Sequence, residues 1–162
     1  MSNKNQWLFN VSMVLLVWLT LPFLGLRNIK KFLPASIFIV IIENLSAQIG
    51  KKRKWWVFYK KNPYISVALP FYIGPFLVGS MWILKWTYGN FKRFVSLNAI
   101  VDGMFAFLMM SLLKKLKVVT LVRFNKIQFF LYMFLKSFLL YGFQYLIEKR
   151  KLLFNIAKNK NF

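Results

Sequence analysis

Three charged residues lie inside long apolar stretches of this sequence, where a charge is costly. Glu43, Asp102 and Lys136 each fall near the middle of such a stretch. A charged side chain at the centre of a bilayer costs about 2.5 to 3.5 kcal/mol on insertion scales, so each one requires a partner or a role. Two carboxylates balanced by one ammonium could relay protons, bind a cation or hold a substrate. Alternatively, Lys136 pairs with Asp102 or Glu43 and only fixes the register of the helices.

Small and polar residues recur on the helical faces that carry these charges. Ser36, Ala47 and Gly50 share a face with Glu43, and Gly103 and Ala106 flank Asp102. Small residues allow helices to approach closely, so these faces are expected to point into a bundle. We therefore predict a buried polar core, whose candidate members are Glu43, Asn44, Asn98, Asp102 and Lys136.

A glycine and a proline lie together almost at the midpoint of the third apolar stretch. Pro75 has no N–H to donate to the carbonyl of Phe71, so a helix should kink or break at Gly74 and Pro75. Broken helices beside intramembrane charges form the midplane sites of many transporters. An ordinary proline kink is the alternative interpretation, because such kinks are common in membrane helices.

The composition indicates lipid as the solvent. Of 162 residues, 59% are hydrophobic and 20% aromatic, above the share of a soluble protein. The apolar residues come in blocks of about 20, the length that crosses about 30 Å of hydrocarbon. We predict an all-α, polytopic helical bundle forming a single integral membrane domain over 1–162, with five transmembrane segments at about 7–26, 32–49, 64–83, 94–113 and 127–147.

The second of these segments is diluted by Glu43, Asn44 and Gln48. A re-entrant helix at 32–49, with four other crossings, is therefore the alternative architecture. With five crossings, the connections carry 12 Lys and Arg on one face and 11 on the other, so the positive-inside rule assigns no orientation. With the re-entrant alternative the faces carry 14 and 9, a modest asymmetry.

The charge balance predicts an anionic partner. The chain has 24 Lys and Arg against three acidic residues, for a formal net charge of +21. Nearly all the basic residues lie in short connections between apolar blocks, where anionic lipid headgroups rather than nucleic acid would meet them. Residues 114–126, which are too short to span, should lie along the interface or form a turn. The predicted headgroup contacts are Lys51, Lys52, Arg53, Lys54, Trp55 and Trp56.

The sequence contains no Cys and no His, which excludes thiol nucleophiles, imidazole bases and the ligands that zinc prefers. We predict no catalytic residue, no metal site and no cofactor, and hence a protein that is not an enzyme. A lipid-modifying enzyme would need carboxylates near the headgroups to hold a metal, and Glu148 alone has an interfacial position.

The run LPFLGLRNIKKFLP, from Leu21 to Pro34, resembles a group of small, uncharacterised multi-pass membrane proteins of spore-forming, low-GC bacteria. In that group a Leu-Pro-Phe-type helix end is followed by a basic turn. The resemblance covers about a fifth of the chain, contains no catalytic motif and implies a location in the bacterial cytoplasmic membrane.

The sequence is compatible with three functions. The first is a non-enzymatic membrane component with a buried polar core. The second is a small transporter, or the substrate-capturing subunit of one, that uses the intramembrane carboxylates. The third is a self-immunity protein against a membrane-active peptide. Because five short helices enclose little volume, we also expect self-association or a larger membrane complex.

Overall fold

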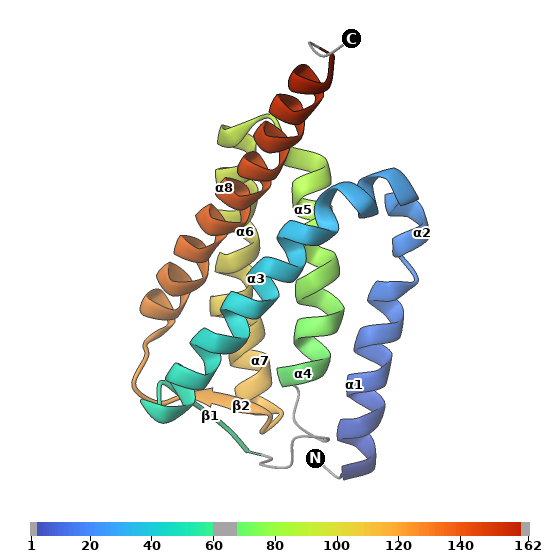
Figure 1. The fold of residues 1–162 in the computed structure, drawn as a ribbon. Helices are drawn as coiled ribbons and strands as arrows, with labels where there is room; N and C mark the ends of the chain where they lie inside the picture. Colours follow the sequence, from blue (N-terminus) through green and yellow to red (C-terminus); the bar gives the residue numbers. More distant parts are fainter. Residues whose placement is uncertain (1–2, 60–67, 160–162) are drawn as a thin grey trace.

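The fold is a bundle of five helical spans, as a computed structural model shows for residues 3–59 and 68–159 (Figure 1). The helices long and apolar enough to cross a membrane are Trp7–Leu24, Leu26–Lys52, Ala68–Thr87, Phe91–Lys115 and Lys126–Phe154. The predicted all-α bundle with about five membrane-length helices is confirmed. Residues 64–67 of the third predicted segment, and the basic residues Lys60 and Lys61, lie outside the described residues.

The first span consists of two helices, α1 (Asn3–Trp18) and the short α2 (Leu21–Leu24). Pro22 occupies the first turn of α2, where its missing N–H has no helical partner to lose. Gly25 follows with a φ of 81°, a left-handed value that glycine adopts without steric cost. The chain can therefore reverse sharply into the next helix.

The second span is one helix, α3 (Leu26–Lys52), without interruption over 27 residues. A re-entrant segment would need the chain to turn back within the bilayer, and α3 instead runs from one end of the bundle to the other (Figure 1). The structure therefore shows Leu26–Lys52 as a continuous helix of membrane length and not as a re-entrant segment. Of the three polar residues named for this segment, Glu43 faces the interior of the bundle, whereas Asn44 and Gln48 are exposed.

The third and fourth spans each contain a short π-helical segment. The third span runs through α4 (Ala68–Phe71), η1 (Tyr72–Phe76) and α5 (Leu77–Thr87). The fourth span runs through α6 (Phe91–Met104), η2 (Phe105–Met109) and α7 (Met110–Lys115). Such π-segments are rare and occur frequently at functional sites. The rings of Phe71 and Phe105 lie 5.1 Å apart, which brings the two irregular regions together.

The fifth span belongs to α8 (Lys126–Asn159), and a two-stranded ribbon precedes it. Strands β1 (Trp56–Phe58) and β2 (Val119–Leu121) pair antiparallel, with Val57 opposite Thr120. The ribbon joins the connections after α3 and after α7 at one end of the bundle, here called the ribbon end (Figure 1). The sequence predicted an interfacial segment or a turn over 114–126 and no strand.

Two apolar clusters form the interior, one toward each end. At the ribbon end, Ala47, Ala106 and Met133 belong to one cluster with Trp56. At the opposite end, Ile39, Phe94 and Leu140 belong to the other. Each of α3, the fourth span and α8 contributes to both clusters, and on each helix polar residues separate the two contributions. The polar residues therefore lie in a layer between two apolar regions.

Candidate functional site

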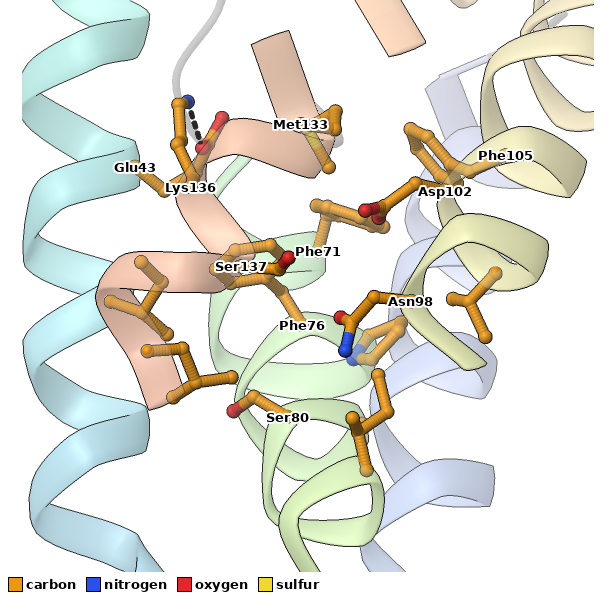
Figure 2. A pocket seen from close by; sticks show the side chains of 16 residues that line it. Glu43, Phe71, Phe76, Ser80, Asn98, Asp102, Phe105, Met133, Lys136 and Ser137 are labelled. Carbon is orange, nitrogen blue, oxygen red and sulfur yellow. Dashed lines mark hydrogen bonds and ion pairs between the residues drawn. The ribbon is translucent and has the colours of Figure 1, made fainter. Parts of the chain in front are cut away.

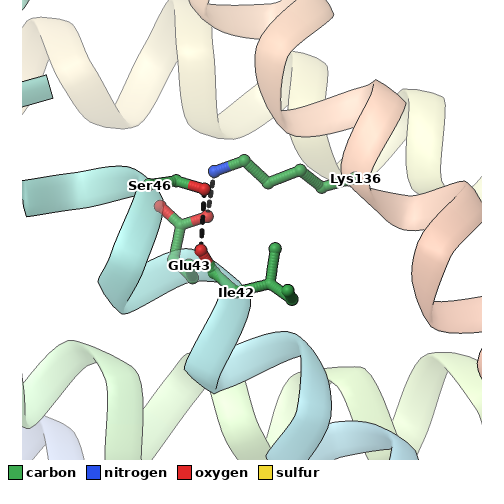
Figure 3. Close-up of polar contacts among 4 residues, drawn as sticks. All are labelled: Ile42, Glu43, Ser46 and Lys136. Carbon is green, nitrogen blue, oxygen red and sulfur yellow. Dashed lines mark hydrogen bonds and ion pairs between the residues drawn. The ribbon is translucent and has the colours of Figure 1, made fainter. Parts of the chain in front are cut away.

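The centre of this layer is an ion pair between Glu43 on α3 and Lys136 on α8 (Figure 3). The Lys136 ammonium donates a hydrogen bond to the Glu43 carboxylate, and both residues are less than one-tenth exposed. The Lys136 Nζ also lies 3.3 Å from the centre of the Tyr132 ring, one turn earlier on α8. A charge pair buried this deeply is stable only as a pair, because either charge alone would lack compensation.

Asp102 on α6 is the third charged residue of the layer, and it stands apart from this pair. Among the described residues its carboxylate joins no ion pair. The atom Oδ2 is buried and has no hydrogen-bond partner in the part of the chain that the structure describes. Lys136 therefore pairs with Glu43 and not with Asp102. The Oδ2 atom of Asp102 can still accept a hydrogen bond.

Asp102 and the ion pair line a common cavity of about 170 Å³ (Figure 2). Its walls come from α3, the third span, α6 and α8, so four of the five spans contribute. The remaining lining is mostly apolar and includes Phe71, Phe76 and Phe105. A second cavity of about 80 Å³ shares Glu43 with the first and extends toward the ribbon end.

The other polar side chains of the cavity each donate one hydrogen bond to their own helix. Ser80 Oγ donates to the carbonyl of Leu77 at 2.7 Å, and Ser137 Oγ donates to the carbonyl of Phe134 at 2.7 Å. Asn98 is buried, and its Nδ2 donates to the carbonyl of Phe94 at 2.8 Å. A hydroxyl that has donated its hydrogen still accepts, so the cavity offers acceptor oxygens from Asp102, Ser80 and Ser137.

The helix break at Gly74 and Pro75 forms part of the cavity wall. Gly74 has φ −96° and ψ −106°, outside the helical range, and Pro75 follows it on the cavity side. The break is stabilised by α1, because Trp18 Nε1 donates to the carbonyl of Ile73 at 2.9 Å. A Cβ on Gly74 would lie 3.3 Å from the Cα of Val14, so glycine allows α1 to approach closely.

Two predicted site residues do not have their predicted environments. Asn44 is exposed on the outside of α3 and does not belong to the polar core, because it follows Glu43 directly and so lies about 100° around the helix. Trp56 does not face headgroups. It is 6% exposed, and its ring covers Gly50, where an added Cβ would lie 2.6 Å from that ring.

The other residues of the predicted headgroup cluster differ in their exposure. Lys51, Lys52, Arg53 and Lys54 are exposed at the ribbon end. Trp55 is half-buried and stacks on Phe124, with ring centres 4.5 Å apart. The four basic side chains can therefore reach anions, whereas the two tryptophans pack the ribbon onto the bundle.

Sequence reasoning missed Ser80 and Ser137 as residues of the site. A serine within an apolar span gives little signal, because its hydroxyl is commonly satisfied by its own helix. Ser137 does follow Lys136 directly, and Ser80 lies near the Gly74–Pro75 break. Only the packing of α5 against α3 and α6 shows that both hydroxyls border the same space.

Five membrane-length helices with many exposed large apolar side chains, such as Leu16, Phe23 and Leu135, define a multi-pass membrane protein. Comparison of the chain with family models, curated proteins and solved structures finds no match.

Proposed function

We propose that this chain is a non-enzymatic protein of the bacterial cytoplasmic membrane that binds a small amine within its helical bundle. In this role it would act as a small transporter or as the substrate-capturing subunit of one. The observation that carries the proposal is the buried Oδ2 of Asp102, which faces a cavity and has no hydrogen-bond partner within residues 3–59 and 68–159. A buried acceptor without a partner costs about 1 to 3 kcal/mol, and a bound donor group would remove that cost.

The chemistry of the cavity supports an ammonium group in particular. Lys136, the cation of the lining, is already paired with Glu43. The hydroxyls of Ser80 and Ser137 line the same cavity as Asp102 and offer further acceptor oxygens. An ammonium has three N–H donors and no acceptor, so it can donate to the Asp102 carboxylate and still use other acceptors of the lining.

The size of the cavity limits the ligand to a small molecule. A cavity of about 150 Å³ holds one benzene molecule, and this cavity has a volume of about 170 Å³. Its aromatic and aliphatic walls favour a ligand with one apolar body and one charged end. Benzylamine and cyclohexylamine are suitable probes of this class.

The test is thermal unfolding of the purified protein in neutral detergent, with benzylamine and, for comparison, benzyl alcohol and toluene. At a concentration tenfold above its Kd, a ligand stabilises the folded state by about 1.4 kcal/mol, so the amine should raise the Tm. The Asp102→Asn variant should lose this rise. Equal stabilisation by toluene, or an unchanged response of Asp102→Asn, would contradict the proposal.

A pair of glycines supplies the matched control. An added Cβ at Gly79 or at Gly142 meets no atom within 4 Å, but only Gly79 lines the cavity. Gly79→Leu should fill the space and abolish the amine response, whereas Gly142→Leu should retain it. Both variants replace a helical glycine, so their effects on helix propensity cancel in the comparison.

The second candidate is a membrane component in which the polar layer serves packing alone. The direct pairing of Glu43 with Lys136 favours it, because the pair is already satisfied without a ligand. This candidate predicts that no amine stabilises the protein and that Asp102→Asn leaves its Tm unchanged or raised.

A further inference from the structure

A groove at the ribbon end combines basic side chains with an apolar floor. It lies between the end of α7, strand β2 and the start of α8, and has a volume of about 680 Å³. Three basic residues, Lys114, Lys115 and Lys126, belong to its lining. The apolar part of the lining comes from Met110, Leu121 and Phe124.

The walls of the groove are fixed by hydrogen bonds. Lys126 Nζ donates to Ser111 Oγ at 2.7 Å, which joins the start of α8 to α7. Asn125 and Gln128 cap the start of α8 reciprocally, with each side chain accepting from the other's backbone N–H at 2.8 and 3.1 Å. Phe124 is held by its stacking on Trp55. The groove is therefore formed before any ligand arrives.

The cations at this end have no carboxylate of the chain to balance them. Ten described Lys and Arg residues lie at the ribbon end, and its connecting segments 51–61 and 114–126 contain no Asp or Glu. At the opposite end, by contrast, Glu148 lies 3.9 Å from Lys31. The charge at the ribbon end must be balanced by anions from outside the chain.

We propose that this groove binds the phosphate headgroup of an anionic phospholipid, with the start of one acyl chain against the apolar floor. Each wall is the terminus of a membrane-length helix, since the fourth span finishes at Lys115 and the fifth begins at Lys126. The groove therefore lies at headgroup depth. Basic clusters beside membrane spans bind anionic lipid in this way. The site differs from the predicted cluster at residues 51–56 and does not depend on the amine-binding cavity.

The experiment titrates the purified full chain in neutral detergent with phosphatidylglycerol and counts bound lipid by native mass spectrometry. Phosphatidylcholine with the same acyl chains and soluble glycerol phosphate are titrated alongside. We expect phosphatidylglycerol to bind best. If phosphatidylcholine binds equally, the lysines do not select the lipid. If glycerol phosphate binds as tightly, the ligand is a free phosphate. Either result for the unaltered protein overturns the proposal.

Matched variants locate the site. The triple variant Lys114→Gln, Lys115→Gln, Lys126→Gln should bind phosphatidylglycerol about a hundredfold more weakly, since each basic residue near an anionic surface contributes about one factor of five. The control Lys149→Gln, Arg150→Gln, Lys151→Gln removes the same charge from the opposite end and should keep full affinity. Equal losses in both triples would show a diffuse charge effect and no groove site. Replacement of the three lysines by arginine should retain binding.

Discussion

Removal of either Glu43 or Lys136 alone would leave the other charge buried without a partner. We expect Glu43→Gln or Lys136→Met to destabilise the protein by roughly 3–5 kcal/mol, the usual cost of breaking a buried pair. The double variant should recover most of that loss, because neither charge remains. Thermal unfolding of the four proteins in neutral detergent gives the coupling between the two residues.

A matched control comes from the partly exposed pair of Lys31 and Glu148, whose charged atoms lie 3.9 Å apart. Lys31→Met should cost less than about 1 kcal/mol, since solvent-exposed pairs contribute little. A double variant of Glu43 and Lys136 whose loss of stability equals the sum of the two single losses would show that the two residues are not coupled.

At the residue scale, the sequence indicated which charges were unusual but not how they pair. The spacing of small residues around Glu43 and Asp102 predicted inward faces, and Glu43 is indeed buried. It did not determine whether Lys136 would reach Glu43 or Asp102, because the relative rotation of three helices decides that choice. Asn44 lies outside the core although it directly follows Glu43, because adjacent residues of a helix point about 100° apart.

At the element scale, the β-ribbon can be tested directly, because the chain has no native cysteine. Val57 and Thr120 are directly opposed, so cysteines at these positions should form a disulfide upon mild oxidation. Opposed residues in an antiparallel pair have Cα atoms about 4.5–5.5 Å apart, within the range that a disulfide bridges. Cleavage between the two cysteines followed by non-reducing electrophoresis gives the result.

The control pairs Val57→Cys with Val122→Cys, two residues further along the chain from Thr120. Diagonal neighbours lie about 7–8 Å apart, so this pair should cross-link poorly. Stronger cross-linking of the control would mean that the register of the ribbon is shifted.

The helices could be predicted from sequence because long apolar blocks give a strong signal, whereas the ribbon could not. Its strands, Trp56–Phe58 and Val119–Leu121, have three residues each and are far apart in the sequence. They meet only because the helices between them fold into the bundle. In the sequence, Trp55 and Trp56 between lysines resemble a headgroup contact. Because β1 pairs with β2, the Trp56 ring instead packs against Gly50 and belongs to the buried apolar cluster.

At the scale of the whole molecule, an odd number of crossings places the two ends of the chain on opposite sides of the membrane. We expect single cysteines at the exposed positions Lys4 and Lys151 to react differently with a membrane-impermeant thiol reagent. In intact cells only one should be labelled, and both should be labelled after permeabilisation. Labelling of both in intact cells, or of neither, would contradict five crossings and favour an even number.

The pairing of Glu43 with Lys136 also imposes an order of events during synthesis. Lys136 follows Glu43 by 93 residues, so at about 5–20 residues per second the carboxylate precedes its ammonium by roughly 5 to 20 s. During that interval Glu43 has no ammonium to pair with, so α3 carries an unpaired carboxylate whose placement at the bilayer centre costs about 2.5 to 3.5 kcal/mol. Stalling of the ribosome before residue 136 should therefore leave a nascent chain whose second span has not settled stably in the lipid.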